Sequence, residues 1–368
     1  MRIGITCYPT YGGSGIVATE LGLELAMRGH EIHFISYANP IRLDPGLPRI
    51  HYHEVEVSNY PLFQYPPYCL ALASHMAEVA ERYHLDLLHV HYAIPHSTSA
   101  SLARDILKPK RRLPFVTTLH GTDITLVGTD RSYYPITKYS IEQSDGVTTI
   151  SDYMRRRTID VFHVANDIDV IGNFVNVSMY RPDPAARPER KRLMHVSNFR
   201  EVKRPLDCVR ILAYVRREVD AELMMVGDGP LRGPCESLAW DLGVQDHVTF
   251  LGKQDHVERL FPRAHILLMP SELEAFGLAA LEAMACGLPP VATACGGVPE
   301  LVADGVTGFL EPVGDVEAQA RRVVQLLTDE ALYRAMAQAA RHDAVTRFST
   351  DLIIPKYESH YERVLSAK

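Results

Sequence analysis

The segment SELEAFGLAALEAMACGLPPVAT, residues 271–293, shows most clearly how this chain is built. One apolar run, residues 266–269, precedes it, and a second, residues 290–292, lies near its end. Between the two runs, small apolar residues after Gly277 predict a helix. Strand, helix and strand in this order predict a unit of a parallel α/β sheet. A helix that starts at a glycine leaves backbone N–H groups open to an anion such as phosphate.

Two glutamates in this segment, Glu274 and Glu282, are separated by seven residues. Along an α-helix their separation spans about 12 Å and turns the side chain by roughly 80°, so two helical carboxylates would not meet at one reacting atom. We therefore expect Glu274 in the loop before the helix and Glu282 inside it. Such a pair suits an elongated ligand with hydroxyls and phosphates, for instance a nucleotide sugar. The alternative is an ordinary helix with one exposed and one buried glutamate.

The first half of the chain alternates apolar strands with helical segments. Strands are predicted at residues 2–6, 31–36, 87–91, 115–119 and 146–150, and helices at residues 16–28 and 70–83. This alternation predicts a parallel sheet with helices on both faces.

The alternation stops between residues 173 and 189, where prolines and charged residues predict a linker, and then restarts. Further strands are predicted at residues 192–196, 222–226, 248–250, 266–269 and 290–292, and helices at residues 205–218, at residues 231–242 and after Glu274. The sequence thus predicts an α/β protein of two Rossmann-like, doubly wound domains that face a cleft, residues 1–170 and 171–350. The amphipathic residues 351–368 are expected to join the first domain. In such sheets, ligands bind at the carboxyl ends of the strands.

Composition limits the kinds of partner. Of the 368 residues 46% are hydrophobic and 23% charged, and the net charge is −7, so no nucleic-acid or membrane partner is expected. The six cysteines form no CxxC pair, which is typical of a reduced cytoplasmic protein. The first residues lack a signal-peptide pattern, and no apolar run reaches membrane-spanning length. We expect a cytoplasmic protein, and a homodimer is left open.

Two loops after predicted strands can bind an anion. The first, GGSG at residues 12–15, opens a helix, but it is not the GxGxxG pattern of a dinucleotide site. The second, SNFREVKR at residues 197–204, places Arg200 and Lys203 where both can reach a diphosphate. The alternatives are a tight turn for the first loop and a solvated basic loop for the second.

Four histidines, His89, His91, His96 and His120, gather in the first half of the chain. His89 and His91 alternate along a predicted strand and share one face. No cysteine or carboxylate completes a metal-type spacing with them, so no metal site is predicted. His120 ends a strand before Gly121 and is the better candidate for a functional residue.

In combination these motifs resemble a known family. EAFGLAALE, residues 274–282, resembles the E-x7-E signature of retaining glycosyltransferases with the GT-B fold, of the family 4 type. The glycine loop, the basic loop, the turn VGDGP at residues 226–230 and GGVPE at residues 296–300 occur in the order expected of that family. Within it, residues 65–68, 89–96 and 119–125 resemble members that transfer N-acetylglucosamine from UDP-N-acetylglucosamine to L-malate, the first step of bacillithiol synthesis.

The resemblance implies a role for each matching residue. It implies that Glu274 binds hydroxyls of the transferred sugar, that His120 lies near this sugar, and that Glu282 binds the ribose hydroxyls of the donor. Arg200 and Lys203 would neutralise the diphosphate, and with Glu274 and His120 they are the expected catalytic residues. The amides of Phe276, Gly277 and Leu278 would lie near sugar and phosphate, and Gly13 where the donor phosphate and the acceptor meet. It implies that malate contacts Ser14, Tyr92 and Thr118, and that neither a metal nor a cofactor takes part. One departure is TDRSYY, residues 129–134, where Arg131 adds a positive charge on the acceptor side.

The chain offers no obvious nucleophile-and-acid carboxylate pair of the kind that retaining glycosidases use. The mechanism implied by the family is front-face attack, in which the departing β-phosphate oxygen takes the acceptor proton. Arg200 and Lys203 would stabilise the leaving diphosphate.

Two alternatives to this function stay open. One is a transferase of the same fold with another acceptor, an inositol phosphate or a lipid-linked sugar. The other is a two-domain sugar-binding protein without catalysis.

Overall fold

A computed structural model describes residues 1–10, 12–44, 46–58, 61–186 and 188–367. It divides into two compact units. Unit 1 comprises Met1–Gly172 and Ile353–Lys368, and unit 2 comprises Asn173–Leu352.

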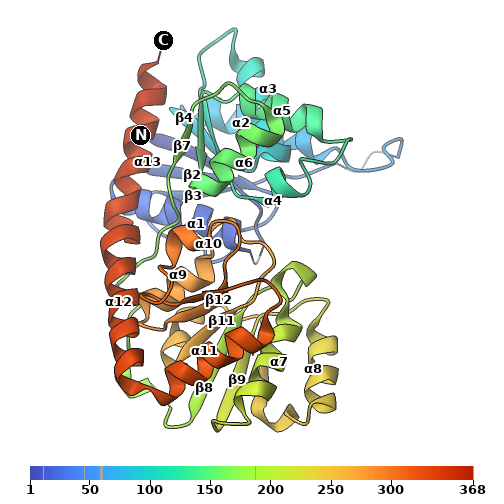
Figure 1. Cartoon of the computed structure of the whole chain (residues 1–368). Helices are drawn as coiled ribbons and strands as arrows, with labels where there is room; N and C mark the ends of the chain where they lie inside the picture. Colours follow the sequence, from blue (N-terminus) through green and yellow to red (C-terminus); the bar gives the residue numbers. More distant parts are fainter. Residues whose placement is uncertain (11, 45, 59–60, 187, 368) are drawn as a thin grey trace. The chain divides into compact units, whose positions relative to one another are not determined.

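Unit 1 is built on a seven-stranded parallel sheet with the order β3-β2-β1-β4-β5-β6-β7 (Figure 1). Ile3 of the central strand β1 lies in register with Ile32 of β2 and with Leu87 of β4. The strands are β1 (Arg2–Thr6), β2 (Glu31–Ser36), β3 (Ile50–Glu54), β4 (Leu87–His91), β5 (Phe115–Leu119), β6 (Gly146–Thr149) and β7 (Ile168–Val170).

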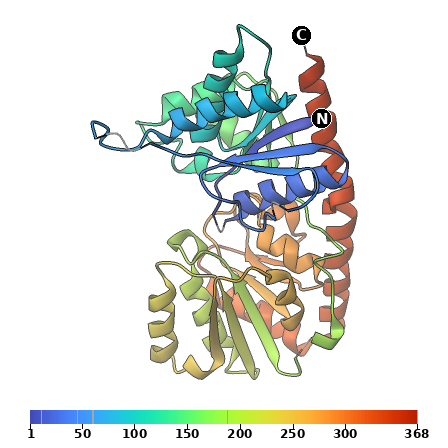
Figure 2. The ribbon, with the colours of Figure 1, turned by 180° about the vertical axis from the view of Figure 1, so that it is seen from behind.

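Helices cover both faces of this sheet, as Figures 1 and 2 show from opposite sides. Leu88 and Val90 of β4 pack in a core with α2 and α3, whereas His89, between them, bonds the α13 residue Tyr361 on the other face. The helices of unit 1 are α1 (Gly13–Met27), α2 (Tyr68–Tyr83), η1 (Ala93–Ser97), α3 (Thr98–Leu107), α4 (Thr122–Thr125), α5 (Tyr134–Glu142), α6 (Asp152–Phe162) and the part of α13 (Thr350–Ser366) from Ile353 onward.

Unit 2 repeats the plan with six parallel strands in the order β10-β9-β8-β11-β12-β13. One face carries a core formed with α7, α8 and α11, and α9 packs with α12. The strands are β8 (Lys191–Val196), β9 (Ala221–Val226), β10 (Val248–Gly252), β11 (Ile266–Met269), β12 (Pro290–Thr293) and β13 (Phe309–Glu311). The main helices are α7 (Pro205–Val215), α8 (Arg232–Asp241), α9 (Leu278–Ala285), α10 (Val298–Leu301), α11 (Val316–Thr328) and α12 (Glu330–Phe348).

Both sheets reverse their strand order at one point, between β1 and β4 in unit 1 and between β8 and β11 in unit 2. This is the order of a doubly wound Rossmann-like sheet, whose ligands bind outside the carboxyl ends of the strands at the reversal. The predicted fold class of two doubly wound α/β halves is therefore confirmed, and each half has one expected ligand position.

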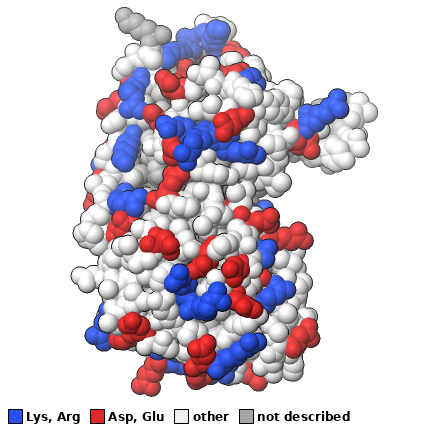
Figure 3. Space-filling model, in the orientation of Figure 1, with Lys and Arg blue, Asp and Glu red and all other residues white. Residues whose placement is uncertain are grey.

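Charged residues of both signs are mixed on the side of the molecule that Figure 3 shows, where Lys and Arg are interspersed with Asp and Glu. Among the described residues, no helix combines the length and the apolar character needed to cross a membrane.

Candidate active site

Each of the two strands at the reversal in unit 2 is followed by a loop that carries a predicted catalytic residue. Lys203 lies in the 3₁₀ turn Glu201–Lys203 after β8, and Glu274 lies in the loop after β11. The Lys203 Nζ donates to Glu274 Oε1 at 2.7 Å, and Ser271 Oγ donates to the same oxygen at 2.8 Å. Both charged side chains are mostly buried, at 23% and 13% exposure. The structure thus brings the two predicted residues together as a shielded ion pair.

Glycines let the loops of this site approach one another closely. Gly296 has φ +54°, and a Cβ there would lie 1.9 Å from the carbonyl oxygen of Glu274. Gly297 donates its backbone N–H to that carbonyl at 2.9 Å. Gly227, in the turn after β9, is equally restricted, since its Cβ would lie 1.8 Å from the Ser197 carbonyl oxygen. Only glycine fits at these two positions, which explains the GGVPE and VGDGP motifs.

His195, which the sequence analysis did not single out, braces the same edge of the sheet. Its Nδ1 donates to the Leu268 carbonyl at 2.9 Å, and its Nε2 accepts from Ser197 Oγ at 2.8 Å. Burial lowers the pKa of His195 to about 4, so the ring is neutral at pH 7 and keeps this tautomer. His195 therefore joins the start of the basic loop to β11. A histidine at the carboxyl end of a strand was the signal available in the sequence.

The helix start predicted to bind an anion is present at α9. Gly277 adopts φ +100°, the helix begins at Leu278, and no side chain caps it. The N–H of Ala280 already bonds the Gly277 carbonyl at 2.9 Å, so the N–H groups of Leu278 and Ala279 are the ones at the positive end of the helix dipole that a ligand can use. The Phe276 side chain turns away into the core and packs edge-on against Phe348, with 5.7 Å between ring centroids. Phe276 can therefore contribute its backbone, not its ring.

Glu282 lies within α9 and Glu274 in the loop before it, as their spacing predicts. Glu282 is 7% exposed, and its Oε1 accepts a hydrogen bond from the Tyr180 hydroxyl at 2.7 Å. Tyr180 is also buried, and it too was missed from the sequence because it is 102 positions away. The bond restrains the buried carboxylate within α9.

Arg200 differs from Lys203, because no described residue pairs with its charge. It precedes the 3₁₀ turn and is exposed, and in the part of the chain that the structure describes no acceptor binds its guanidinium. The charge of Lys203 is balanced by Glu274, so Arg200 supplies the uncompensated positive charge of this loop. A diphosphate is the kind of ligand that a free guanidinium binds well.

At the reversal in unit 1 lie two residues expected to contact the acceptor, Ser14 and Tyr92, together with Gly13, which is expected near the donor phosphate. Gly13 and Ser14 begin α1 after β1, and Gly12 offers no side-chain cap. Tyr92 follows β4 with φ +85°, a strained conformation for a residue with a side chain. Its ring lies 5.3 Å from the Tyr8 ring and 5.5 Å from the His120 ring. Tyr8, after β1, is thus an additional aromatic wall of this position.

His120 lies in a line of neutral histidines. Its Nε2 is 2.8 Å from the Nδ1 of His91, and burial lowers the pKa of His120 to about 3. Burial also holds the pKa of His91 well below its ordinary value. At neutral pH His120 therefore acts as a hydrogen-bonding group and not as a cation. Asp123 fixes the turn after it by accepting from the Gly121 N–H at 2.9 Å and the Ala93 N–H at 3.1 Å.

Thr118 lies deeper than a ligand contact requires. It is fully buried, and its hydroxyl bonds His89 Nε2 at 2.7 Å and Thr148 Oγ1 at 2.6 Å. The structure does not bring this side chain to the position of Tyr92 and His120. Its backbone carbonyl instead accepts from the Tyr92 N–H at 2.9 Å, so Thr118 helps to place Tyr92.

The segment at residues 129–134, which departs from the family pattern, follows α4 and is mainly exposed, and its last residue, Tyr134, begins α5. Its start is tied to the turn after β5, since a Cβ at Gly128 would lie 1.9 Å from the Asp123 carbonyl oxygen. Arg131 is exposed, and it has no ion-pair partner among the described residues.

Two family models match the chain one after the other. Residues 11–179 match the model described as Glycosyltransferase Family 4, and residues 178–343 match the model described as Glycosyl transferases group 1. Among solved structures, sucrose-phosphate synthase from Thermosynechococcus elongatus superposes with a TM-score of 0.81 at 22% identity, with 100% of each chain covered. Anabaena HepE in complex with UDP-glucose superposes with a TM-score of 0.82 at 20% identity, covering 100% of this chain and 99% of that one. These likenesses support the fold.

Curated relatives carry the comparison further. The N-acetyl-alpha-D-glucosaminyl L-malate synthase of Bacillus anthracis is 47% identical over 373 aligned residues, which cover 99% of this chain and 97% of that protein. The D-inositol 3-phosphate glycosyltransferase of Mycobacterium marinum is 28% identical and covers 94% of this chain. The resemblance seen in the motifs is thereby confirmed along the whole chain. With two consecutive family matches and a full-length relative at this identity, the chain belongs to glycosyltransferase family 4.

Proposed function

We propose that this glycosyltransferase moves N-acetylglucosamine from UDP-N-acetylglucosamine to the hydroxyl of L-malate with retention of configuration, the first step of bacillithiol synthesis. The substrates are suggested by the printed name of the relative that is 47% identical. The chemistry is supported by one observation above all, the Lys203–Glu274 pair at the strand reversal of unit 2.

The proposal assigns the donor to unit 2. Glu282, fixed by Tyr180, holds the ribose hydroxyls, and Glu274 holds hydroxyls of the transferred sugar. The amides of Phe276, Gly277 and Leu278 at the start of α9 face the phosphates. Because Glu274 lies in a loop and Glu282 in a helix, the two carboxylates can contact two separate parts of one nucleotide sugar.

In the proposed mechanism the bond between the anomeric carbon and the β-phosphate oxygen breaks while the malate hydroxyl attacks from the same face. The hydroxyl proton passes to the departing phosphate oxygen, so no protein base is needed. Arg200 and Lys203 stabilise the charge that develops on the UDP leaving group. Glu274 keeps the ammonium of Lys203 in place, and two of its three N–H donors remain for oxygen ligands.

The proposal assigns the acceptor to unit 1, at Ser14, Tyr92 and the turn that carries His120, with Gly13 near the donor phosphate. His120 is neutral and donates or accepts one hydrogen bond to a sugar or acceptor hydroxyl. Thr118 acts through Tyr92 rather than by contact. Arg131 lies next to this group in sequence and is a source of positive charge for a dicarboxylate. A reducing compartment such as the cytoplasm suits the six cysteines, which are all free thiols.

The test is an acceptor panel. Purified protein is incubated with UDP-N-acetylglucosamine and either L-malate, D-malate, inositol 3-phosphate or no acceptor, and UDP release is measured. We expect release with L-malate and an α-linked product by NMR. If UDP is released with inositol 3-phosphate and not with L-malate, the acceptor is inositol 3-phosphate, as in the name of the 28% identical relative. No release with any acceptor would overturn the proposal in favour of sugar binding without transfer.

A second measurement tests whether protein side chains, and not a metal ion, stabilise the charge on the leaving UDP. Turnover with L-malate is followed before and after exhaustive treatment with EDTA. We expect turnover to persist, because Arg200 and Lys203 provide the positive charge. Loss of turnover that Mg²⁺ restores would contradict this part of the mechanism.

A further inference from the structure

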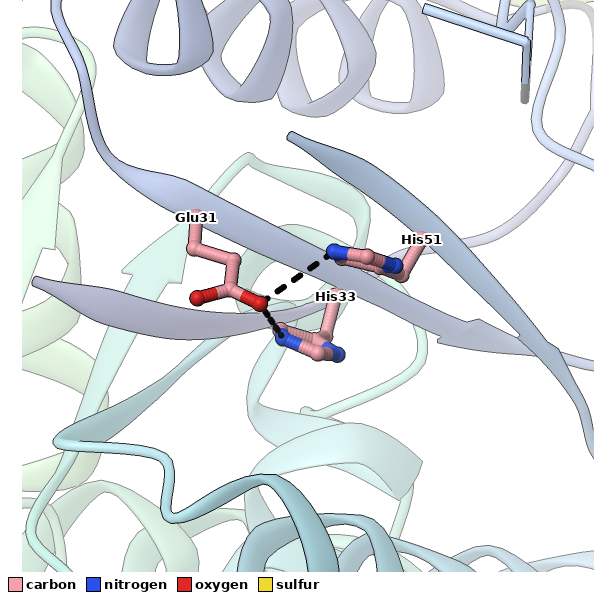
Figure 4. A group of neighbouring side chains, drawn as sticks. All are labelled: Glu31, His33 and His51. Atoms are coloured by element: carbon pink, nitrogen blue, oxygen red, sulfur yellow. Dashed lines mark ion pairs between the residues drawn. The ribbon is translucent and has the colours of Figure 1, made fainter. Parts of the chain in front are cut away.

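A second cluster of functional side chains lies on the strands β2 and β3 of unit 1. Glu31 and His33 come from β2 and His51 from β3, and in the parallel register His33 is directly opposite His51 (Figure 4). One ligand atom from each of the three lies within 4.8 Å of the others. Glu31 and His33 are near the amino end of β2, whereas the acceptor residues of unit 1 follow the carboxyl ends of its strands. The cluster is therefore separate from the proposed acceptor site.

We propose that Glu31, His33 and His51 bind a divalent transition-metal cation of the Zn²⁺ class that fastens the edge strand β3 to the sheet. Two imidazoles and one carboxylate are a donor set that suits Zn²⁺, with water in a fourth position. The Glu31 Oε1 lies 3.3 Å from His51 Nε2 and 3.6 Å from His33 Nε2. Ligand atoms about 2.0–2.1 Å from a tetrahedral ion are separated by about 3.3 Å, so these spacings suit a shared ion.

His33 provides the independent argument for a ligand. The residue is fully buried, yet its Nε2 finds no hydrogen-bond partner among the residues that the structure describes. The 3.6 Å to Glu31 is too long for such a bond. Buried polar atoms of this kind are uncommon and call for a partner, because each one has lost its bond to water. The nitrogen faces the carboxylate oxygen in Figure 4, so a cation between them would satisfy both.

The neighbours of the cluster favour binding through Nε2. His33 Nδ1 lies 2.9 Å from His53 Nε2, so a proton on Nδ1 is held by His53 and leaves the lone pair of His33 Nε2 for a metal. Burial lowers the pKa of His33 to about 4, which keeps the ring neutral at pH 7. Arg2 donates to the other oxygen of Glu31, Oε2, at 3.3 Å and leaves Oε1 free for the cluster.

Binding requires one adjustment. The His33 and His51 rings are nearly parallel, at 19° with 4.5 Å between centroids, and two parallel rings cannot both point their nitrogens at one ion. His51 must tilt toward Glu31. Its side chain is 41% exposed and Glu31 is 38% exposed, so the ring is able to move and the cation has a path from solvent.

The test uses the full chain after chelator treatment, titrated calorimetrically with ZnCl₂, and with Co²⁺ for its visible spectrum. We expect one equivalent of Zn²⁺ to bind and Co²⁺ to give a four-coordinate spectrum. Both His51→Ala and Glu31→Gln should weaken binding by at least about tenfold. The matched control is His256→Ala, which removes an exposed histidine of unit 2 that lies 3.1 Å from Glu258, and it should bind like the unaltered chain.

Hydrogen exchange supplies a readout of folding that is independent of sugar transfer. Zn²⁺ should slow exchange of the β3 amides in the unaltered chain and in His256→Ala, but not in His51→Ala. Absence of stoichiometric binding to the unaltered chain would overturn the proposal, as would equal binding by His51→Ala. Turnover of UDP-N-acetylglucosamine should be the same in His51→Ala, because these residues are outside the catalytic machinery.

Discussion

At the scale of single residues, the Lys203–Glu274 ion pair allows the effect of losing Lys203 on turnover to be predicted. Lys203→Ala should leave the fold intact and lower kcat/KM by about 10²–10³-fold, because a charge that stabilises the leaving diphosphate is lost. The measurement is steady-state UDP release, with circular dichroism to check folding. Lys191→Ala is the matched control, since Lys191 begins the same strand that ends before the basic loop, and it should retain full activity. Unchanged kcat/KM in Lys203→Ala would remove Lys203 from the mechanism.

Tyr180 tests whether Glu282 serves binding rather than chemistry. Tyr180→Phe removes only the hydroxyl that bonds the buried Glu282 carboxylate at 2.7 Å. A bond to a charged group contributes about 1.5–3 kcal/mol, so UDP should bind roughly 10-fold or more weakly, with little change in kcat. The dissociation constant of UDP is measured by calorimetry.

An exposed bond of the same kind provides the comparison for Tyr180. The Tyr214 hydroxyl donates to Glu317 at 3.0 Å on the surface of unit 2, and Tyr214→Phe should leave UDP affinity unchanged. An equal loss in both variants, or a fall in kcat alone in Tyr180→Phe, would contradict the assignment of Glu282 to the ribose.

At the level of elements, the loops of unit 2 depend on backbones that approach one another too closely for a side chain. Gly296→Ala places a Cβ 1.9 Å from the Glu274 carbonyl oxygen, in addition to the strain of φ +54°. Gly305→Ala is the matched control, because Gly305 has φ +72° but nothing within 4 Å of its Cβ. Gly305→Ala should cost about 1–2 kcal/mol of unfolding free energy and leave turnover unchanged. Gly296→Ala should cost clearly more and abolish most turnover, since it displaces Glu274.

Denaturant unfolding and UDP release together check this prediction. Equal losses of stability in the two variants would mean that the left-handed backbone, and not the contact with Glu274, is what requires glycine at position 296.

The elements that sequence reasoning found are those with an unambiguous apolar pattern. Strands such as β2, β4 and β5 match their predicted bounds because they are buried on both faces. The edge strand β3, IHYHE, was missed, since three of its five residues are partly exposed and it carries two histidines and a glutamate. Helices α11 and α12 were not predicted, although their N-cap residues Asp315 and Asp329 each accept a helix N–H and are visible in the sequence.

The candidate site shows the same division. Residues next to a strand end, such as Lys203 and Glu274, could be found from local sequence, and the structure places them in contact. Their supports could not, because Tyr180 is 102 positions from Glu282 and His195 is 73 from Leu268. The resemblance implied that Thr118 contacts the acceptor. Thr118 and His120 share one face of the sheet, but Thr118 lies within β5 and not after its end, and its hydroxyl bonds His89 and Thr148 in the interior.

At the level of the whole molecule, neutral histidines are unevenly divided between the units. Of the 17 histidines, 12 lie in unit 1 and five in unit 2. In unit 1 burial lowers the pKa to about 4 for His33, His53 and His96, to about 3 for His120, and well below the ordinary value for His89 and His91. In unit 2 burial lowers the pKa of His195 to about 4.

Acidification should therefore destabilise unit 1 more than unit 2. Between the ordinary histidine pKa of 6.5 and the lowered values near 4, the unfolded chain binds protons that the folded chain excludes. The free energy of unfolding consequently falls as pH falls through this window, by on the order of 3 kcal/mol at its acid end for a buried histidine such as His96.

Hydrogen exchange read by mass spectrometry at pH 7.5 and pH 5, with exchange times scaled for the intrinsic rates, measures each unit separately. The β4 and β5 amides should lose protection at pH 5 while those of β8 and β11 keep most of theirs. Equal loss in both units, or earlier loss in unit 2, would show that carboxylates rather than these histidines govern acid stability.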